Sequence, residues 1–392
     1  MIFILITILL LLPYLILILY YRKSWLAIPD FIPVKKITEN ELPYVSIIIA
    51  ARNEELNIGN CLRTIINQSY PKNKFEVIVT DDHSTDKTVT IINSYQEENI
   101  SVIHLSDFLD NEKINSYKKK SIETALQFAK GELIVTTDAD CVVPPKWIET
   151  LVALYKEKNP VFVALPVVFP PSPLGEGTGV RRFSVSLLKI FQSLDFMTLQ
   201  GITGASVYKK FNSMCNGANL AYEKKVFYEV GGFKGIDEIA SGDDMLLMGK
   251  IQKVYPDKVM FLKSPDVIVE TQAASTLKDF LNQRIRWASK ADKYTDSKIT
   301  AVLMLVYLFN AWILILGISS FFSHKSFSLF LIAIGIKISV ELFFLYPVAK
   351  FFGEKKLLWW FVPAQLFHIF YTLVAGWLGK FGTYRWKGRK VK

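Results

Sequence analysis

Cysteine is scarce in this chain, with three among 392 residues. Cys61, Cys141 and Cys215 are odd in number, lie far apart and form no C-x-x-C pair. This pattern excludes a disulfide framework and a zinc site of the usual spacing. Internal repeats and low-complexity tracts are also lacking.

The first 21 residues lack charge, and they lack the basic start and the small residues at a cleavage site that mark a secretory signal. They are almost entirely apolar and are long enough to cross a bilayer as one helix. Arg22 and Lys23 follow directly. Because basic residues favour the cytoplasmic side, residues 1–22 predict a transmembrane helix with the next domain in the cytoplasm.

Acidic residues are fewer than basic ones, 36 against 46, so the net charge is +10. Hydrophobic residues make up 51% of the chain, and the mean hydropathy of +0.26 is high for a wholly soluble protein. Part of the chain is therefore expected in lipid. Cytoplasmic loops and anionic headgroups then explain the positive charge better than nucleic acid does.

Three long apolar stretches near the C-terminus, 299–322, 327–348 and 357–378, can each span a bilayer. We assign residues 298–392 to a C-terminal transmembrane region with a basic tail. Lys337 and Glu341 lie four apart in the second stretch, and we favour a structural ion pair between them.

The membrane topology is ambiguous at this point. Three C-terminal spans together with the N-terminal one would place both chain ends outside, whereas the basic tail prefers the cytoplasm. Either one stretch is re-entrant or interfacial, or the tail is an exception.

Residues 44–275 alternate predicted strands with predicted helices. Apolar runs predict buried strands at 44–51, 75–80, 100–105 and 133–137, and helical spacing occurs at 54–67 and 119–130. The alternation predicts an α/β domain with a mainly parallel sheet and helices on both faces. Ligands bind such sheets at the carboxyl ends of the strands.

A pair of carboxylates, Asp138 and Asp140, follows the strand predicted at 133–137. The D-x-D spacing puts both on one side of the chain where the strand ends. Two adjacent like charges need a cation, and their hard oxygens suit Mg²⁺ or Mn²⁺. A solvated acidic turn is the alternative for this motif taken alone.

Other polar groups are expected near the same edge or on the membrane side. Residues 52–55 and 81–86 follow the first two strands, and Asp243-Asp244 stand at a predicted helix start. A helix at 276–297 brings Gln283 and Arg286 to one face, with Trp287 adjacent, and is predicted to be interfacial. A further helix at 183–199 either packs on the domain or touches lipid.

These motifs, in this order, resemble the family 2 glycosyltransferases, whose nucleotide-sugar domain has the GT-A fold. The resemblance covers residues 44–287 and the membrane layout. Gln283, Arg286 and Trp287 match the Q-x-x-R-W motif of membrane-bound members such as ceramide glucosyltransferases and the synthases of hyaluronan and cellulose.

The resemblance implies a donor site. Ala51, Glu54 and Asp82 would hold the nucleotide base and ribose. Asp140, with Asp138 nearby, would hold Mg²⁺ or Mn²⁺ on the diphosphate. His83 departs from the family, which usually has Gly or Asn at that position. Its larger side chain in the second loop makes the nucleotide specificity uncertain from the sequence.

The resemblance also implies a catalytic set. Asp244 would be the general base, with Asp243 as second choice, since a helix start favours a negatively charged carboxylate. Arg286 would meet the diphosphate and Trp287 would flank the acceptor, with Gln283 facing the same way.

The expected activity is that of an inverting family 2 hexosyltransferase in the cytoplasmic (inner) membrane, with its catalytic domain facing the cytoplasm. It would move a sugar from a nucleotide-sugar, with a UDP-sugar favoured, to a lipid or lipid-linked glycan. A processive polysaccharide synthase is the alternative, and a non-catalytic nucleotide-sugar binding protein is less favoured. A transporter would need more spans and more intramembrane charges.

Overall fold

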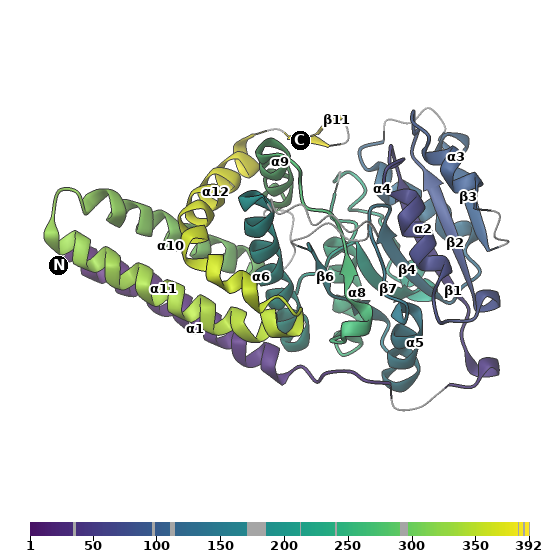
Figure 1. The fold of residues 1–392 in the computed structure, drawn as a ribbon, viewed down its shortest axis with the longest axis horizontal. Coiled ribbons are helices and arrows are strands. Elements are labelled where there is room, and N and C mark those ends of the chain that lie inside the picture. Colours follow the sequence, from purple (N-terminus) through teal and green to yellow (C-terminus); the bar gives the residue numbers. More distant parts are fainter. Residues whose placement is uncertain are drawn as a thin grey trace, which may run out of the picture.

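The computed structural model describes residues 1–33, 37–95, 99–109, 114–170, 186–211, 213–239, 241–290, 297–382, 384–386 and 389–391. An α/β domain stands at one end of the molecule, and long helices extend from it as a rod (Figure 1). The basic side chains predicted for the tail lie outside the described residues, as do the segments 171–185 and 291–296.

The domain is built on a seven-stranded sheet of order β3-β2-β1-β4-β7-β5-β8, in which β7 alone runs antiparallel to its neighbours. Its strands are β1 (Val45–Ala51), β2 (Phe75–Asp81), β3 (Ile100–His104), β4 (Leu133–Asp138), β5 (Phe162–Ala164), β7 (Asn219–Glu223) and β8 (Val259–Phe261). A separate pair joins β6 (Val167–Val168) to β9 (Val269–Glu270). The predicted mainly parallel sheet is confirmed.

Both faces of the sheet are covered, as predicted. Alternate side chains of a strand point to opposite faces, so Ile47 and Ile49 enter one core and Ile48 the other. The first core packs against α2 (Ile58–Ile66) and α5 (Trp147–Lys158). The second packs against α4 (Tyr117–Phe128) and α8 (Met245–Val254).

The helix predicted at 54–67 begins later than expected, because the loop before it bonds to the loop that follows β2. The backbone N–H of Glu54 donates to Thr88 Oγ1 at 2.7 Å, and that of Glu55 donates to Asp86 at 3.1 Å. Residues 54–57 therefore precede α2 instead of forming its first turn. Asp86 accepts from the N–H of Thr88, where α3 (Thr88–Asn93) begins.

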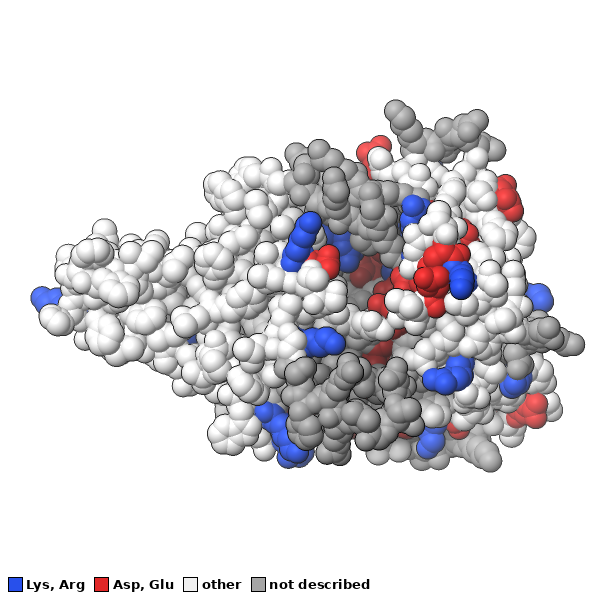
Figure 2. Space-filling view, turned by 45° about the horizontal axis from the view of Figure 1, so that its top comes forward, with Lys and Arg blue, Asp and Glu red and all other residues white. Residues whose placement is uncertain are grey.

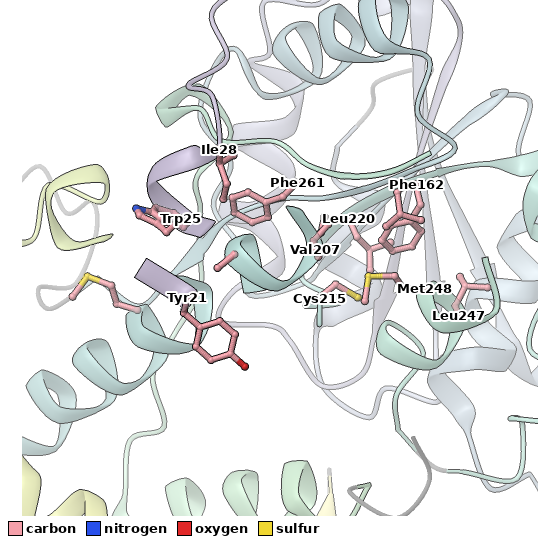
Figure 3. Packing of buried hydrophobic residues seen from close by; sticks show 14 of the residues in the cluster. Tyr21, Trp25, Ile28, Phe162, Val207, Cys215, Leu220, Leu247, Met248 and Phe261 are labelled. Carbon is pink, nitrogen blue, oxygen red and sulfur yellow. The ribbon is translucent and has the colours of Figure 1, made fainter. Parts of the chain in front are cut away.

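The rod consists of α1 (Ile2–Ala27), α10 (Ser297–Ser319) and α11 (His324–Phe351), which pack side by side. The first helix is longer than the predicted 1–22, because its end is buried in the domain. Trp25 is 1% exposed, and its ring lies 6.1 Å from that of Phe261 (Figure 3). The membrane helix is thus anchored directly on the sheet.

Two helices lie between the rod and the sheet, α6 (Leu187–Lys209) and α9 (Leu277–Ala288). The first replaces the helix predicted at 183–199 and runs ten residues further. Its Gly204 faces Trp25 so closely that a Cβ there would lie 2.7 Å from the indole. This helix packs on the domain, as one interpretation predicts, and also on α1 and α11, whereas contact with lipid stays a prediction.

A fourth apolar helix, α12 (Phe361–Phe381), follows a 3₁₀ segment, Lys355–Trp360. It is long enough to cross a membrane. However, it packs chiefly on α9 and α10, and a Cβ at Gly379 would lie 2.7 Å from Ala288 at the end of α9. The chain ends beside α9, at the domain end of the rod, whereas the N-terminus lies at the far end (Figure 1).

Polar groups join the apolar helices. Lys337 and Glu341 form the predicted pair, with Nζ and Oε1 2.7 Å apart. Gln365 of α12 bonds to both, and Tyr14 of α1 donates to Glu341. The pair is therefore satisfied by protein rather than exposed to lipid, as expected for ions within a membrane.

Candidate active site

All ten residues that the sequence singles out line one cavity. It opens at the carboxyl ends of β1, β2 and β4 and is closed by the start of α8 and one face of α9. Figure 2 shows acidic side chains inside this hollow and along its edge. The ten are Ala51, Glu54, Asp82, Asp138, Asp140, Asp243, Asp244, Gln283, Arg286 and Trp287.

Strand register builds the first wall. Ala51 pairs with Asp81 of β2, and Ala50 pairs with Asp138 of β4, so three strand ends meet. Because the strands are parallel, the loops that follow them all emerge at this edge.

The β1 and β2 loops are bound to each other. Arg52 donates to the backbone carbonyl of Asp82 at 2.9 Å, and the N–H of Thr85 donates to Asn53 Oδ1 at 2.8 Å. His83 adopts a φ of 57° and places its Nδ1 3.0 Å from Asp82 Oδ1. The unusual histidine thus contacts the carboxylate that was predicted to hold the base.

A lysine that the sequence analysis missed lies among the carboxylates. Lys118, in the first turn of α4, has its Nζ 2.7 Å from Asp138 Oδ1 and 3.3 Å from Asp243 Oδ2. Burial opposes its charge, but the two carboxylates outweigh burial and raise the pKa of Lys118. The one available signal was topological, since α4 begins at the edge where β2 and β4 end.

Asp138 and Asp140 are the residues that could hold a divalent cation. Among the described residues, no three His, Cys, Asp or Glu side chains are grouped to hold a metal. Asp138 and Asp140 nevertheless create a negative potential. Burial raises the pKa of the Cys61 thiol, and these two carboxylates raise it further. Two hard oxygen donors with phosphate oxygens completing the shell match what Mg²⁺ prefers.

The adjacent acids Asp243 and Asp244 differ in their surroundings. Burial alone would raise the pKa of Asp243, but Lys118 and Lys290 outweigh burial and lower it. Asp244 caps α8, where it accepts from the N–H of Met245 at 2.7 Å and of Gly217 at 3.0 Å. Asp243 is thus engaged in an ion pair, which leaves Asp244 the better candidate base.

Lys119 holds the segment that leads into these acids. Its Nζ donates to the carbonyls of Ile236 and Ile239 at 2.6 Å and to that of Ser241 at 3.1 Å. Burial lowers its pKa to about 8, so the ammonium form still predominates at neutral pH. Consecutive lysines of α4 therefore serve the site in different ways, because Lys118 faces the carboxylates and Lys119 the backbone.

The last wall is aromatic. Trp287 lies beside Phe196 of α6, with ring centroids 6.1 Å apart, and Phe196 stacks on Phe169 at 4.1 Å. Both phenylalanines line the cavity. Nothing in the sequence distinguishes them from core residues, and both are buried.

Comparison with known proteins agrees with this geometry. The sequence profile described as "Glycosyl transferase family 2" matches residues 46–231. Residues 46–231 therefore form a glycosyltransferase family 2 domain. It is 26% identical over 288 residues to "Probable glycosyltransferase YdaM" of Bacillus subtilis, covering 71% of this chain and 62% of that protein.

A second relative is "Beta-monoglucosyldiacylglycerol synthase" of Nostoc, 31% identical over 127 residues, which cover 32% of this chain and 26% of that protein. Each match therefore spans less than two thirds of the relative. The mannosyltransferase PcManGT of Pyrobaculum calidifontis, solved with GDP-Man and Mn²⁺, superimposes with a TM-score of 0.57 at 20% identity, covering 93% of this chain and 97% of that one. The family 2 domain thus has the predicted GT-A fold.

Proposed function

We propose that this protein is a membrane-bound inverting hexosyltransferase that moves a sugar from a nucleotide-sugar to a lipid or lipid-linked glycan. One observation carries the proposal, which is that ten polar or motif residues scattered from Ala51 to Trp287 line a single cavity. A UDP-sugar is the favoured donor.

The reaction would be one displacement at the anomeric carbon. Asp244 accepts the proton of the acceptor hydroxyl as its oxygen bonds to that carbon. The bond from the carbon to the diphosphate oxygen breaks, and the nucleoside diphosphate leaves with the electron pair. Arg286 and Lys118 offset its charge. Asp138 and Asp140 would hold a divalent cation, which when bound supplies further charge neutralisation.

The acceptor is inferred from position. The cavity wall that contains Trp287 and Phe196 belongs to α9, which packs on the apolar helix α12, and to α6, which packs on α1 and α11 of the rod. A hydroxyl on a lipid could therefore approach from the bilayer. The Nostoc relative, whose name includes diacylglycerol, supports a lipid acceptor.

The proposal predicts sugar transfer into lipid. The full chain would be reconstituted in vesicles containing dioleoylglycerol and incubated with UDP-[¹⁴C]glucose or GDP-[¹⁴C]mannose, in the presence of Mn²⁺ or of EDTA. The reaction products would then be extracted and separated into lipid and polymer fractions. We expect label in lipid, with one sugar per acceptor, and loss of transfer in EDTA. A ladder of products would favour the processive synthase, and donor binding without consumption would favour the non-catalytic protein.

The orientation of the protein is also proposed. Arg22 near the end of α1, Lys350 near the end of α11 and Lys356 in the 3₁₀ segment after it carry positive charge. These ends of α1 and α11 lie at the domain end of the rod (Figure 1), which the positive-inside rule places in the cytoplasm. We expect α1, α10 and α11 to span the membrane. Since α12 begins next to the end of α11 and finishes beside α9, we assign it to a re-entrant or interfacial position with the tail in the cytoplasm.

Cysteine labelling tests this topology. The three native cysteines are buried, so single cysteines can be added at exposed Phe322, at exposed Lys146 and after the last residue. With a membrane-impermeant maleimide, we expect Phe322→Cys to react in spheroplasts. Lys146→Cys and the C-terminal cysteine should react only in inside-out vesicles. Labelling of the C-terminal cysteine together with Phe322→Cys would mean that α12 spans the membrane.

A further inference from the structure

The helix that carries Gln283, Arg286 and Trp287 has another polar side chain, which points away from the cavity. Arg284 is 4% exposed, and its Nη2 lies 2.6 Å from Asp195 Oδ2 of α6. The side chain of Asp195 is 5% exposed, so both charges are buried. Neither residue lines the cavity.

The membrane helix α12 completes this buried cluster. The hydroxyl of Tyr371 donates to Asp195 Oδ1, and His368 Nε2 lies 4.0 Å from the same oxygen. Three helices that are distant in the chain, α6, α9 and α12, therefore meet at one carboxylate. The aromatic rings of Phe191 and Phe280 pack against Tyr371 and shield the cluster from water.

Arg284 also contacts the cavity wall itself. Its guanidinium carbon lies 4.2 Å from the ring centroid of Trp287 and 5.0 Å from that of Phe280. A desolvated cation over an indole is attracted by the negative face of the ring. The position of Arg284 therefore constrains the tryptophan that lines the cavity.

A second contact fixes where the helix begins. Gln192, one turn before Asp195 on α6, donates to the carbonyl of Ala274 and accepts from its N–H, each at 2.9 Å. Ala274 lies three residues before the start of α9. Both the entry and the buried face of α9 are thus held by one surface of α6.

A buried ion pair gives little net stability over apolar side chains of the same shape, because desolvation offsets the attraction. What it does provide is a fixed orientation. We infer that Asp195, Arg284 and Tyr371 are positioning residues that hold Trp287 at the acceptor side of the cavity and link α12 to the active site. This inference rests on the proposed transferase activity.

The role predicts a division between nucleotide binding and transfer. The predicted base and ribose contacts lie on the β1 and β2 loops, whereas the cluster acts on α9. A displaced Trp287 would misalign the acceptor, and a shift of about 1 Å can reduce a rate about 10²-fold. The expected signature is a lower kcat and a higher acceptor KM, with the affinity for UDP or GDP little changed.

The test compares full-length variants in dioleoylglycerol vesicles with the donor that wild type consumes. Arg284→Gln alone leaves a buried carboxylate unpaired, so the double variant Asp195→Asn with Arg284→Gln, which removes both charges, keeps the fold testable. Tyr371→Phe deletes one hydrogen bond, and Lys278→Gln removes an exposed charge from the same helix as the matched control. Calorimetry with UDP or GDP and Mn²⁺, together with thermal unfolding, accompanies the kinetics.

We expect at least a tenfold lower kcat over acceptor KM in the double variant, an intermediate loss in Tyr371→Phe, and none in Lys278→Gln. Nucleotide affinity should stay within about threefold and unfolding near wild type. Wild-type transfer by the double variant would refute the positioning role, as would a parallel fall in nucleotide affinity and unfolding temperature. If wild type itself transfers no sugar, the proposed function fails instead.

Discussion

Replacing Asp244 by asparagine is expected to reduce sugar transfer by a factor on the order of 10² to 10⁴, the usual contribution of a general base. Asparagine has nearly the same shape, but its single amide oxygen can accept from only one of the two N–H groups, of Met245 and Gly217, that donate to the two oxygens of Asp244. It cannot take the proton of the acceptor hydroxyl. Steady-state transfer, with calorimetric nucleotide binding measured in parallel, would show loss of turnover and retention of donor affinity.

Asp243→Asn is the matched control, because it makes the same chemical change one residue away. That variant loses a partner of Lys118 and should weaken donor binding as well as turnover. If Asp243→Asn loses turnover alone while Asp244→Asn transfers normally, the two acids exchange roles. Full activity of both variants would remove the acid pair from the mechanism.

The sheet and the edge that carries the site could be predicted because both rest on local patterns. The apolar runs that contain Ile47 and Ile134 predict buried strands, and parallel strands end at a common edge. The position of Asp138 at the end of β4 and of Asp244 at the cap of α8 follows from these patterns. Which residue performs which step stays a prediction.

Contacts between distant segments could not be predicted from local pattern. In the sequence, Asp195 is an isolated acidic residue in an apolar helix. Its partners Arg284 and Tyr371 are distant from it in the sequence. The end of the first helix was also misjudged. Arg22 and Lys23 suggested that the helix ends at residue 22. The helix continues to Ala27, because Trp25 packs in a buried position against Phe261. Tertiary packing overrides the local signal in each case.

The proposed position of α12 rests on its packing and not on its composition. Hydropathy cannot distinguish a spanning helix from one that packs across the base of a helical rod, since both need apolar surfaces. Leu366, Phe370 and Trp377 are exposed on one side, as either arrangement requires. The contacts with α9 on its other side are the basis for the proposed re-entrant or interfacial position, in which the tail would be cytoplasmic.

Replacing Lys118 by methionine is expected to lower transfer by about 10²-fold, comparable with the loss of one donor to a developing negative charge. Methionine keeps the unbranched stem but removes the ammonium that joins Asp138 and Asp243. The two carboxylates would then repel each other and the incoming diphosphate, so the donor KM should rise while kcat falls. Initial rates at varied donor concentration would measure both.

The pH profile separates this role of Lys118 from a purely structural one. Lys118 helps to hold the pKa of Asp243 below its ordinary range, so its removal should raise that pKa. A carboxylate with a raised pKa takes up its proton at a higher pH. The acid limb of the pH–rate profile should therefore move to higher pH in Lys118→Met. It should stay near wild type in Lys118→Arg, which keeps the positive charge. It should also be unaffected in Lys120→Met, which removes a neighbouring positive charge. An unshifted limb with a normal donor KM would mean that Lys118 only supports packing, and the diphosphate would then depend on Arg286 and the cation alone.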